Sequence, residues 1–297
     1  MPFIRSRLKT PGQRPSTLKS GRPIMDKAVV TALFKKDVLH LIKTKNLLLT
    51  LIIVPLIFST VIPAALSGFV LFSDVKSMMD PAMLQMMDKM TAGLNAGEIH
   101  SLNEKFLYVF TNFLYPSLFL LIPIITSSAI AANSFAGEKE RRTLESLLFS
   151  PITIKELFAG KLLASFLPSA AVSLASFILS GTVINTASYI LMGHLIFPSA
   201  KWLVLILVLS PLVMIMTILL NIMISAKVKT YQEAQNIGGI IVLPVIGMLI
   251  GQFSGLFLLG IELMLILSLL VLLLNLFLFN RVLKYNNRNS LFENQIG

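Results

Sequence analysis

The stretch LLLTLIIVPLIFSTVIPAALSGFVLF, residues 47–72, contains no charged side chain. It is longer than the roughly 20 apolar residues that a helix needs to cross a hydrocarbon core of about 30 Å. Lipid offers the backbone no hydrogen-bonding partner, so a segment of this kind must be helical. The composition agrees, because 55% of the residues are hydrophobic and only 13% are charged, against about 25% charged in a soluble domain. The sequence therefore predicts an all-α integral membrane protein.

Further apolar runs of similar length follow, and together they predict six transmembrane helices. The spans are expected at 47–72, 106–134, 158–184, 202–224, 237–256 and 259–281. The boundary between the last two is the least sharply defined, because GMLIGQFSG (247–255) separates them without any charge.

Lysine and arginine are distributed unevenly over the segments between these spans. The N-terminal segment 1–46 contains eleven, 135–161 five, 225–236 two and the C-terminal end from residue 281 onward three, whereas 73–105 and 185–201 contain three and one. In membrane proteins the basic loops are the cytoplasmic ones. We therefore expect both termini in the cytoplasm of a multi-pass plasma-membrane protein. The net charge of +11 is assigned to this orientation and to contact with membrane lipids, not to nucleic-acid binding.

The chain divides into four regions on this basis. Residues 1–25 are basic, contain proline and glycine and lack an apolar core, so we expect a disordered tail, with Met25 as an alternative natural start. An amphipathic, basic helix is expected over 26–46, at the inner membrane surface. The six-span domain occupies 47–283, and a cytoplasmic tail follows at 284–297.

The outer segment 73–105 is rich in methionine. It contains Met78, Met79, Met83, Met86, Met87 and Met90, and most of these follow helical spacing. Thioether sulfurs could bind copper(I), or the methionines could be flexible apolar side chains of an amphipathic helix that packs on the membrane or on its neighbours. The packing interpretation is favoured, because no cysteine accompanies them and His100 lies well past the stripe.

The chain lacks the motifs of several enzyme classes. The absence of cysteine excludes disulfides, thiolate metal sites and cysteine nucleophiles. No P-loop is present, because Gly160 and Lys161 are followed by leucine and no glycine stands five positions earlier. The histidines are too scattered for a close-spaced metal motif, and there is no GxSxG. We therefore expect a protein that is not an enzyme and that binds no cofactor or metal itself.

The most highly charged stretch is FAGEKERRTLESLLFSP, residues 135–151. A helix is expected over 138–149, with three leucines on one face at i, i+3 and i+4. On the other face Glu138 would reach Arg142, and Arg141 would reach Glu145, at i+4.

This charged helix has its own boundaries. Pro151 ends it, and a capping box of Thr153 and Glu156 begins the next helix. Such a bounded helix could bind a soluble partner, or it could be an ordinary connecting helix in the inner interface.

The longer run FAGEKERRTLESLLFSPITIKELFAGKLLA, residues 135–164, resembles the signature of ABC-2 type transporter permeases, the membrane subunits of ATP-driven exporters. The matching residues are Glu138, Glu140, Arg141, Thr143, Leu144, Glu145, Leu147, Leu148, Pro151, Ile152, Gly160 and Lys161. Residues 35–46 look like the family's elbow helix before the first span, and residues 225–236 are similar to its second cytoplasmic loop. The resemblance covers most of the chain from residue 26 onward.

The resemblance implies that this chain is the permease subunit of a prokaryotic ABC exporter. A separate cytoplasmic ABC ATPase, in two copies, would bind ATP, and the permease would form a homodimer or a heterodimer with a second permease. The segment 135–157 would couple the two subunits. The residues that would contact the ATPase are Glu138, Glu140, Arg141, Arg142, Thr143, Leu144, Glu145, Leu147 and Leu148. The apolar spans favour a hydrophobic or amphipathic cargo.

For the pathway we expect spans two and five of the two halves to face each other. Proline can kink a helix and leave carbonyl groups facing a cavity. The candidates are Pro116 and Pro123 in span two and Pro244 in span five. A second candidate set, Gly247, Gly251 and Gly255, falls on one helical face, which lets backbones approach closely. That pattern could equally serve packing within the chain or an outer re-entrant turn.

Two other functions stay open. A stand-alone secondary transporter or channel needs ionisable groups at membrane depth, and Glu262, near the outer end of the last span, is the one candidate. A membrane scaffold or immunity protein would use the cytoplasmic helix to recruit a partner without transport. The scarcity of charge within the spans favours a transporter whose energy arrives from another subunit.

Overall fold

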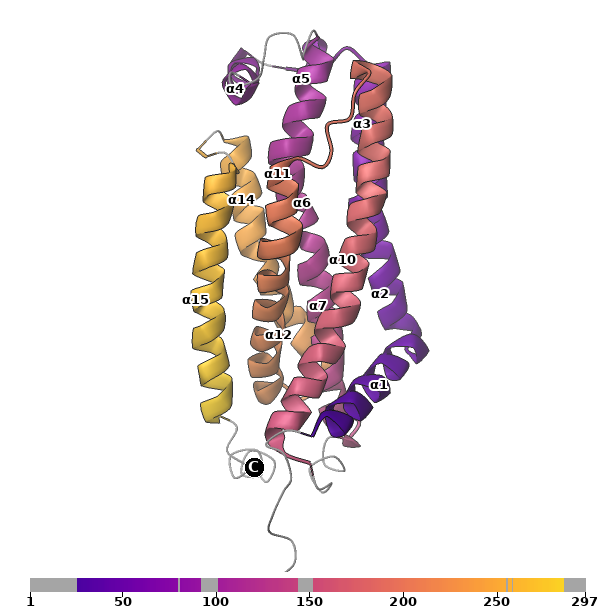
Figure 1. The fold of residues 1–297 in the computed structure, drawn as a ribbon, viewed down its shortest axis with the longest axis vertical. Helices are drawn as coiled ribbons and strands as arrows, with labels where there is room; N and C mark the ends of the chain where they lie inside the picture. The colour runs from indigo at the N-terminus through magenta and orange to yellow at the C-terminus, as the bar shows by residue number, and fades with distance from the viewer. Residues whose placement is uncertain are drawn as a thin grey trace, which may run out of the picture.

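The computed structural model describes residues 26–79, 81–91, 101–143, 152–254, 256–257 and 259–285. Within these ranges the chain is helical and contains no strand, and its long helices run along one bundle (Figure 1). This confirms the predicted all-α fold.

The elements follow one another without large domains between them. In chain order they are α1 (Lys27–Lys43), α2 (Lys45–Leu56), η1 (Ile57–Val61), α3 (Ile62–Phe72), η2 (Val75–Met78), α4 (Pro81–Thr91), α5 (Leu102–Val109), η3 (Phe110–Leu114), α6 (Tyr115–Phe119), α7 (Leu121–Ala132), η4 (Asn133–Gly137), α8 (Glu138–Glu140), α10 (Ile154–Met192), α11 (Ala200–Val204), η5 (Leu205–Leu209), α12 (Ser210–Lys227), α13 (Tyr231–Gly238), η6 (Gly239–Val242), α14 (Leu243–Phe253) and α15 (Ile261–Tyr285). Of the η elements, η1, η3, η4 and η5 are π-helical turns, and η2 and η6 are 3-10 turns.

Six helical segments are long and apolar enough to cross a membrane, as the sequence predicts. They are Lys45–Phe72, Leu102–Glu140, Lys155–Met192, Ala200–Lys227, Tyr231–Phe253 and Ile261–Val282, numbered here as spans one to six. Span five begins earlier than expected. The reason is a helix cap, because the Thr230 hydroxyl accepts a hydrogen bond from Glu233 N and starts the helix at Tyr231.

Span two is the central helix of the bundle. In its most apolar stretch 89% of the residues are buried inside the chain, against 28% in spans one, three, five and six. Its segment α7 contacts α2, α10, α12 and α13. The chain's own helices thus cover most of span two. The expectation that spans two and five of the two halves face each other stays a prediction.

Buried aromatic side chains join the first four spans. Trp202 is fully buried, and its Nε1 donates to the Thr111 carbonyl at 3.1 Å. Tyr115 lies beside it, with ring centroids 5.3 Å apart. The Tyr115 hydroxyl donates to the Phe58 carbonyl at 3.0 Å and lies 2.5 Å from Ser180 Oγ. Buried tyrosine and tryptophan need such polar partners, so these contacts align spans one to four.

Helical irregularity accompanies each proline predicted to kink a span. Pro116 stands in the first turn of α6, directly after the π-helical turn η3. Pro244 stands in the first turn of α14, directly after the 3-10 turn η6. Pro123 follows the break between α6 and α7 at Leu120. Because proline has no amide hydrogen, it fits where the regular hydrogen-bond pattern is already changed.

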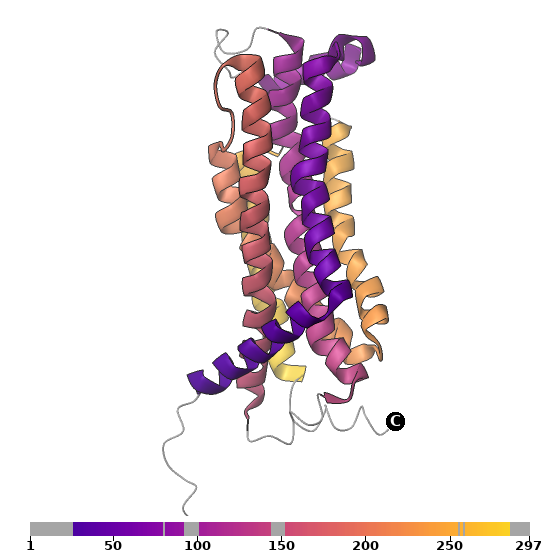
Figure 2. The same ribbon diagram turned by 90° about the vertical axis from the view of Figure 1, so that its right-hand side faces the viewer.

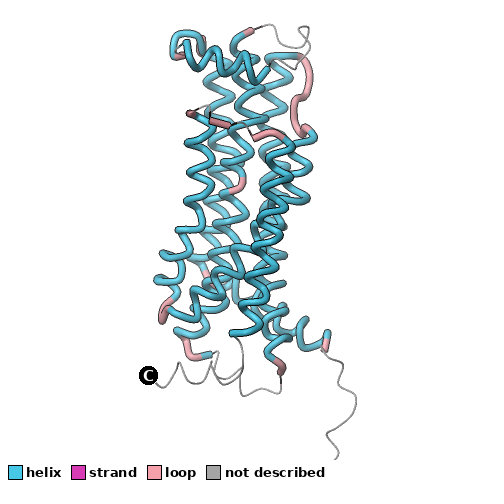
Figure 3. Tube along the Cα trace, turned by 90° about the vertical axis from the view of Figure 1, so that its left-hand side faces the viewer, coloured by secondary structure: helices cyan, strands magenta, loops and turns pink. Residues whose placement is uncertain are grey.

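The two ends of the bundle differ. At one end α1 crosses the bundle obliquely (Figure 2), and at the other α4 lies across the tips of the helices (Figure 1). In α4, Met87 and Met90 are buried in a cluster with Val109 and Phe113 of span two, so these two methionines pack as apolar side chains. Most loops lie at the two ends (Figure 3).

Candidate functional site

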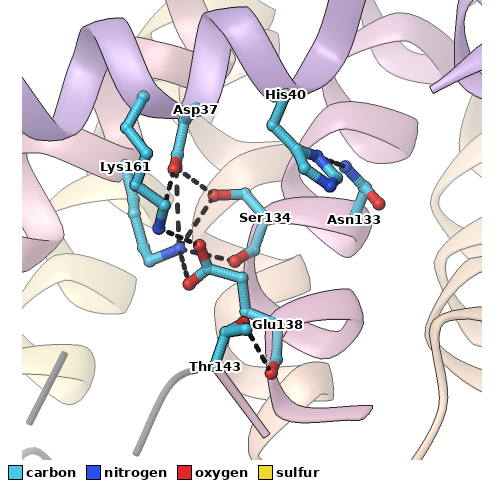
Figure 4. Close-up of polar contacts among 8 residues, drawn as sticks. Asp37, His40, Asn133, Ser134, Glu138, Thr143 and Lys161 are labelled. Atoms are coloured by element: carbon cyan, nitrogen blue, oxygen red, sulfur yellow. Dashed lines mark hydrogen bonds and ion pairs between the residues drawn. The ribbon is translucent and has the colours of Figure 1, made fainter. Parts of the chain in front are cut away.

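A buried ion pair lies where the end of span two meets the start of span three (Figure 4). Lys161 of α10 is fully buried, and its Nζ donates to Glu138 Oε2 at 2.5 Å. The same ammonium group donates to the Ser134 carbonyl at 2.6 Å and to Ser134 Oγ at 3.1 Å. All the hydrogen-bonding capacity of this lysine is therefore used inside the protein.

Helix α1 supplies two more charges. Lys36, which is half-exposed, donates to Glu138, and Asp37 accepts a hydrogen bond from Ser134 Oγ at 2.7 Å. Asp37 oxygens also lie 3.6 Å from Lys161 Nζ and 3.5 Å from Lys36 Nζ. Two ammonium and two carboxylate groups thus form one neutral group, here called the four-charge cluster. Pairing of this kind is what makes buried charges tolerable.

Gly160 explains how α1 comes close enough to complete the cluster. A Cβ at this position would lie 2.8 Å from Leu33 Cβ, so only glycine allows α1 to cross α10 so closely. Val30, Leu33 and Leu41 are buried on α1. Gly160 therefore lets α1 pack closely against α10, and the adjacent Lys161 pairs with the Asp37 carboxylate of α1.

The capping box predicted at the start of α10 is confirmed. Thr153 N donates to Glu156 Oε2 at 2.8 Å, and Glu156 N donates to Thr153 Oγ1 at 3.2 Å. Glu156 Oε1 also accepts a hydrogen bond from Asp26 N at 2.7 Å. The cap of span three thereby holds the beginning of α1 as well.

The turn η4 brings one further polar pair to the cluster. Asn133 Nδ2 lies 3.4 Å from His40 Nδ1 of α1. Burial lowers the pKa of His40, the positive charge of Arg141 lowers it further, and the carboxylates of Asp37 and Glu138 oppose both effects. The surroundings of His40 therefore favour the neutral form of its imidazole ring.

The helix predicted over 138–149 is not continuous. Helix α8 ends at Glu140, and Arg142 adopts a left-handed φ of 56°. Glu138 and Glu140 thus belong to the end of span two. The predicted pair of Glu138 with Arg142 is wrong, because Glu138 pairs with the lysines of the cluster. An exposed i+4 pair contributes only about 0.2–0.5 kcal/mol, whereas an unpaired buried charge costs several kcal/mol.

The structure describes only some of the other residues predicted to contact a partner. Arg141, Arg142 and Thr143 are exposed at the end of span two, while Glu140 accepts a hydrogen bond from Tyr231 N at 2.8 Å. The remaining predicted residues, Leu144, Glu145, Leu147 and Leu148, and the predicted helix end at Pro151, lie outside the described residues.

Sequence reasoning assigned no structural role to Lys36, Asp37 or Lys161. The signal that could have found the cluster is Lys161, which lies inside the expected third span, where an ionisable side chain needs a partner. Glu262 therefore is not the sole ionisable side chain within the expected spans, and its candidacy as an ion-coupling group stays a prediction. Glu262 itself is exposed in the first turn of α15.

Two of the glycines predicted on one face of span five lie in different surroundings within the chain. A Cβ on Gly251 would lie 2.5 Å from the ring of Phe257, whereas Gly247 has no atom within 4 Å of such a Cβ. Gly255 lies outside the described residues. The close approach at Gly251 is made within the chain, at the turn that follows span five.

Comparison with known proteins agrees with this architecture. A family model described as ABC-2 family transporter protein matches residues 31–277. The matched range contains the whole four-charge cluster and most of span six. No curated protein and no solved structure matches the chain. Because the family match covers most of the chain and all six spans are present, the chain belongs to the ABC-2 transporter family and is a multi-pass membrane component of an ABC-type transporter.

Proposed function

We propose that this chain is the permease subunit of an ABC exporter, which moves a substrate out of the cytoplasm with ATP hydrolysed by a separate subunit. Permeases of the ABC-2 family generally work with an ATPase partner, and the family match supports the membrane role. The missing P-loop is the reason to assign ATP hydrolysis to another chain.

The observation that carries the proposal is the position of the four-charge cluster at the start of the segment that resembles the ATPase-contacting part of these permeases. Glu138 is bound to Lys161 of α10 and to Lys36 of α1. A displacement of the exposed residues Arg141 and Arg142 therefore acts on span two, span three and α1 together. A rigid connection of this kind is what coupling to a moving partner requires.

The orientation follows from charge. Among the residues that the structure describes, most lysines and arginines belong to segments at the cluster end of the bundle, so we assign this end, with both termini, to the cytoplasm of a prokaryotic cell. Two permease chains would pair over two ATPase subunits. Closure of the ATPase pair would press on the end of span two and rotate the helices that the cluster joins.

Co-expression with a candidate ABC ATPase subunit from the same organism tests the proposal. We expect the two chains to co-purify and, in inside-out vesicles, to accumulate a fluorescent amphipathic probe only with ATP. A matched control replaces the P-loop lysine of the ATPase, which should abolish accumulation and leave the complex intact.

The two other functions give different results in the same experiment. A secondary transporter would accumulate the probe without the ATPase. A scaffold would bind the ATPase, and accumulation of the probe would not respond to ATP.

A further inference from the structure

The two residues after Glu138 hold the loop between α12 and α13. Lys139 Nζ donates to the carbonyl of Val228 at 2.9 Å and to that of Ala226 at 3.4 Å, at the end of α12. Glu140 Oε2 accepts a hydrogen bond from Tyr231 N at 2.8 Å, at the first residue of α13. Adjacent residues of opposite charge thus bind the two helix ends that flank one short loop.

The sign of each charge matches the helix end that it binds. Unpaired carbonyls make the C-terminal end of a helix partially negative, and unpaired amide hydrogens make the N-terminal end partially positive. Lys139 therefore stabilises the end of α12, and Glu140 stabilises the start of α13. Exchanging the two side chains would place each beside a partial charge of its own sign.

Apolar contacts also hold the same loop. Ala132 and Ala136 of span two form a buried cluster with Val228 and Ala234. Their small side chains let α13 lie close to span two. The loop is fixed both by this cluster and by the charged pair that follows Glu138.

Exposed polar residues of the two segments belong to the same end of the bundle. They are Arg141, Arg142 and Thr143 after span two, and Lys229, Gln232 and Glu233 between spans four and five. We propose that Lys139 and Glu140 are positioning residues that lock the α12–α13 loop to the end of span two, so that the ATPase subunit docks on both segments. This inference rests on the proposed function. It extends the coupling to spans four and five.

Cysteine protection tests the docking surface, because the natural chain contains no cysteine. Gln232→Cys, Arg142→Cys and His194→Cys are prepared singly, and maleimide labelling is measured in nanodiscs with and without the ABC ATPase that co-purifies with the chain. We expect the bound ATPase to slow labelling at Gln232→Cys and Arg142→Cys. His194→Cys, exposed near the opposite end of α10, is the control and should label equally fast in both samples.

The outcomes separate the two proposals. Protection at Arg142→Cys without protection at Gln232→Cys overturns the two-segment surface and leaves the proposed function standing. If the ATPase neither co-purifies nor protects either position, both proposals fail.

A second experiment tests the positioning role. Lys139→Met, combined with Gln232→Cys, should reduce protection by the ATPase about two- to fivefold, the effect of one charge at a helix end. Lys139→Arg keeps the charge and should retain protection, and continued protection of Arg142→Cys in the Lys139→Met background shows that the complex still forms. Unchanged protection at Gln232→Cys in Lys139→Met would overturn the role of Lys139.

Discussion

Lys161 Nζ lies 2.5 Å from Glu138 Oε2, and the lysine side chain has no exposed surface. This contact joins the last turn of span two to the first turns of span three, and Lys36 and Asp37 extend it to α1. The charged segment that resembles the ATPase-contacting part of ABC-2 permeases therefore begins at a fixed internal anchor.

Replacing one member of the pair should be costly. Lys161→Met leaves two carboxylates near one half-exposed lysine, and we expect a loss of about 3–5 kcal/mol in the free energy of unfolding. Denaturant titration of the purified protein in detergent measures it. The double variant Glu138→Gln with Lys161→Met should lose clearly less than the sum of the single variants, because it removes the unpaired charge. Additive losses would contradict a direct coupling.

Gly160→Ala should loosen α1. The new Cβ would lie 2.8 Å from Leu33 Cβ, and an overpacked contact of this kind costs about 1–3 kcal/mol. The expected result is lower thermal stability and faster tryptic cleavage within α1. Gly247→Ala is the matched control, since its Cβ meets nothing within 4 Å.

Arg142→Gly should stabilise the end of span two. A non-glycine residue in the left-handed region costs about 1–2 kcal/mol, and Arg142 has a φ of 56°. Arg142→Val should have the opposite effect, because branched side chains tolerate this region least. Arg141→Gly removes the same charge at a φ of −81°, so it should not stabilise. Equal effects of the two glycine variants would show that charge, not backbone conformation, is responsible.

His40 should make stability depend on pH. Its pKa is lowered from the usual 6.5 by burial and by Arg141, so the unfolded chain binds a proton at a higher pH than the folded chain does. Stability should therefore fall as the pH drops through 6.5 towards the folded pKa, and His40 should contribute no such loss at higher pH. Thermal unfolding of wild type and His40→Gln across this range measures it. A loss of the same size in both would refute the assignment.

Several local features of this chain could be derived from the sequence. The capping box of Thr153 and Glu156 was predictable because its partners are three residues apart and use the backbone between them. The six spans were predictable because length and polarity alone decide whether a helix can enter lipid. The packing of Met90 agrees with its place in the helical stripe of methionines, whereas Met87, which is buried in the same cluster, lies outside that stripe.

Other features required contacts that sequence spacing does not contain. The i+4 rule paired Glu138 with Arg142, whereas the folded chain pairs it with Lys36, which lies 102 positions away. The rule failed because a buried charge gains far more from a complete set of partners than an exposed pair gains from proximity along a helix. The break at Arg142 comes directly after Glu138 and Glu140, both of which contact other helices.

By itself, the sequence determined an all-helical chain with six spans, the basic end of the bundle and the family resemblance, because these depend on composition and on neighbours within one helix. Only the tertiary structure decided that span two is the central helix and that Gly160 lets α1 pack closely against α10. It also decided that some charges at the end of span two bind other helices, while others are exposed. Those outcomes depend on which helices contact one another, and this is set by the packing of segments that lie far apart in the sequence.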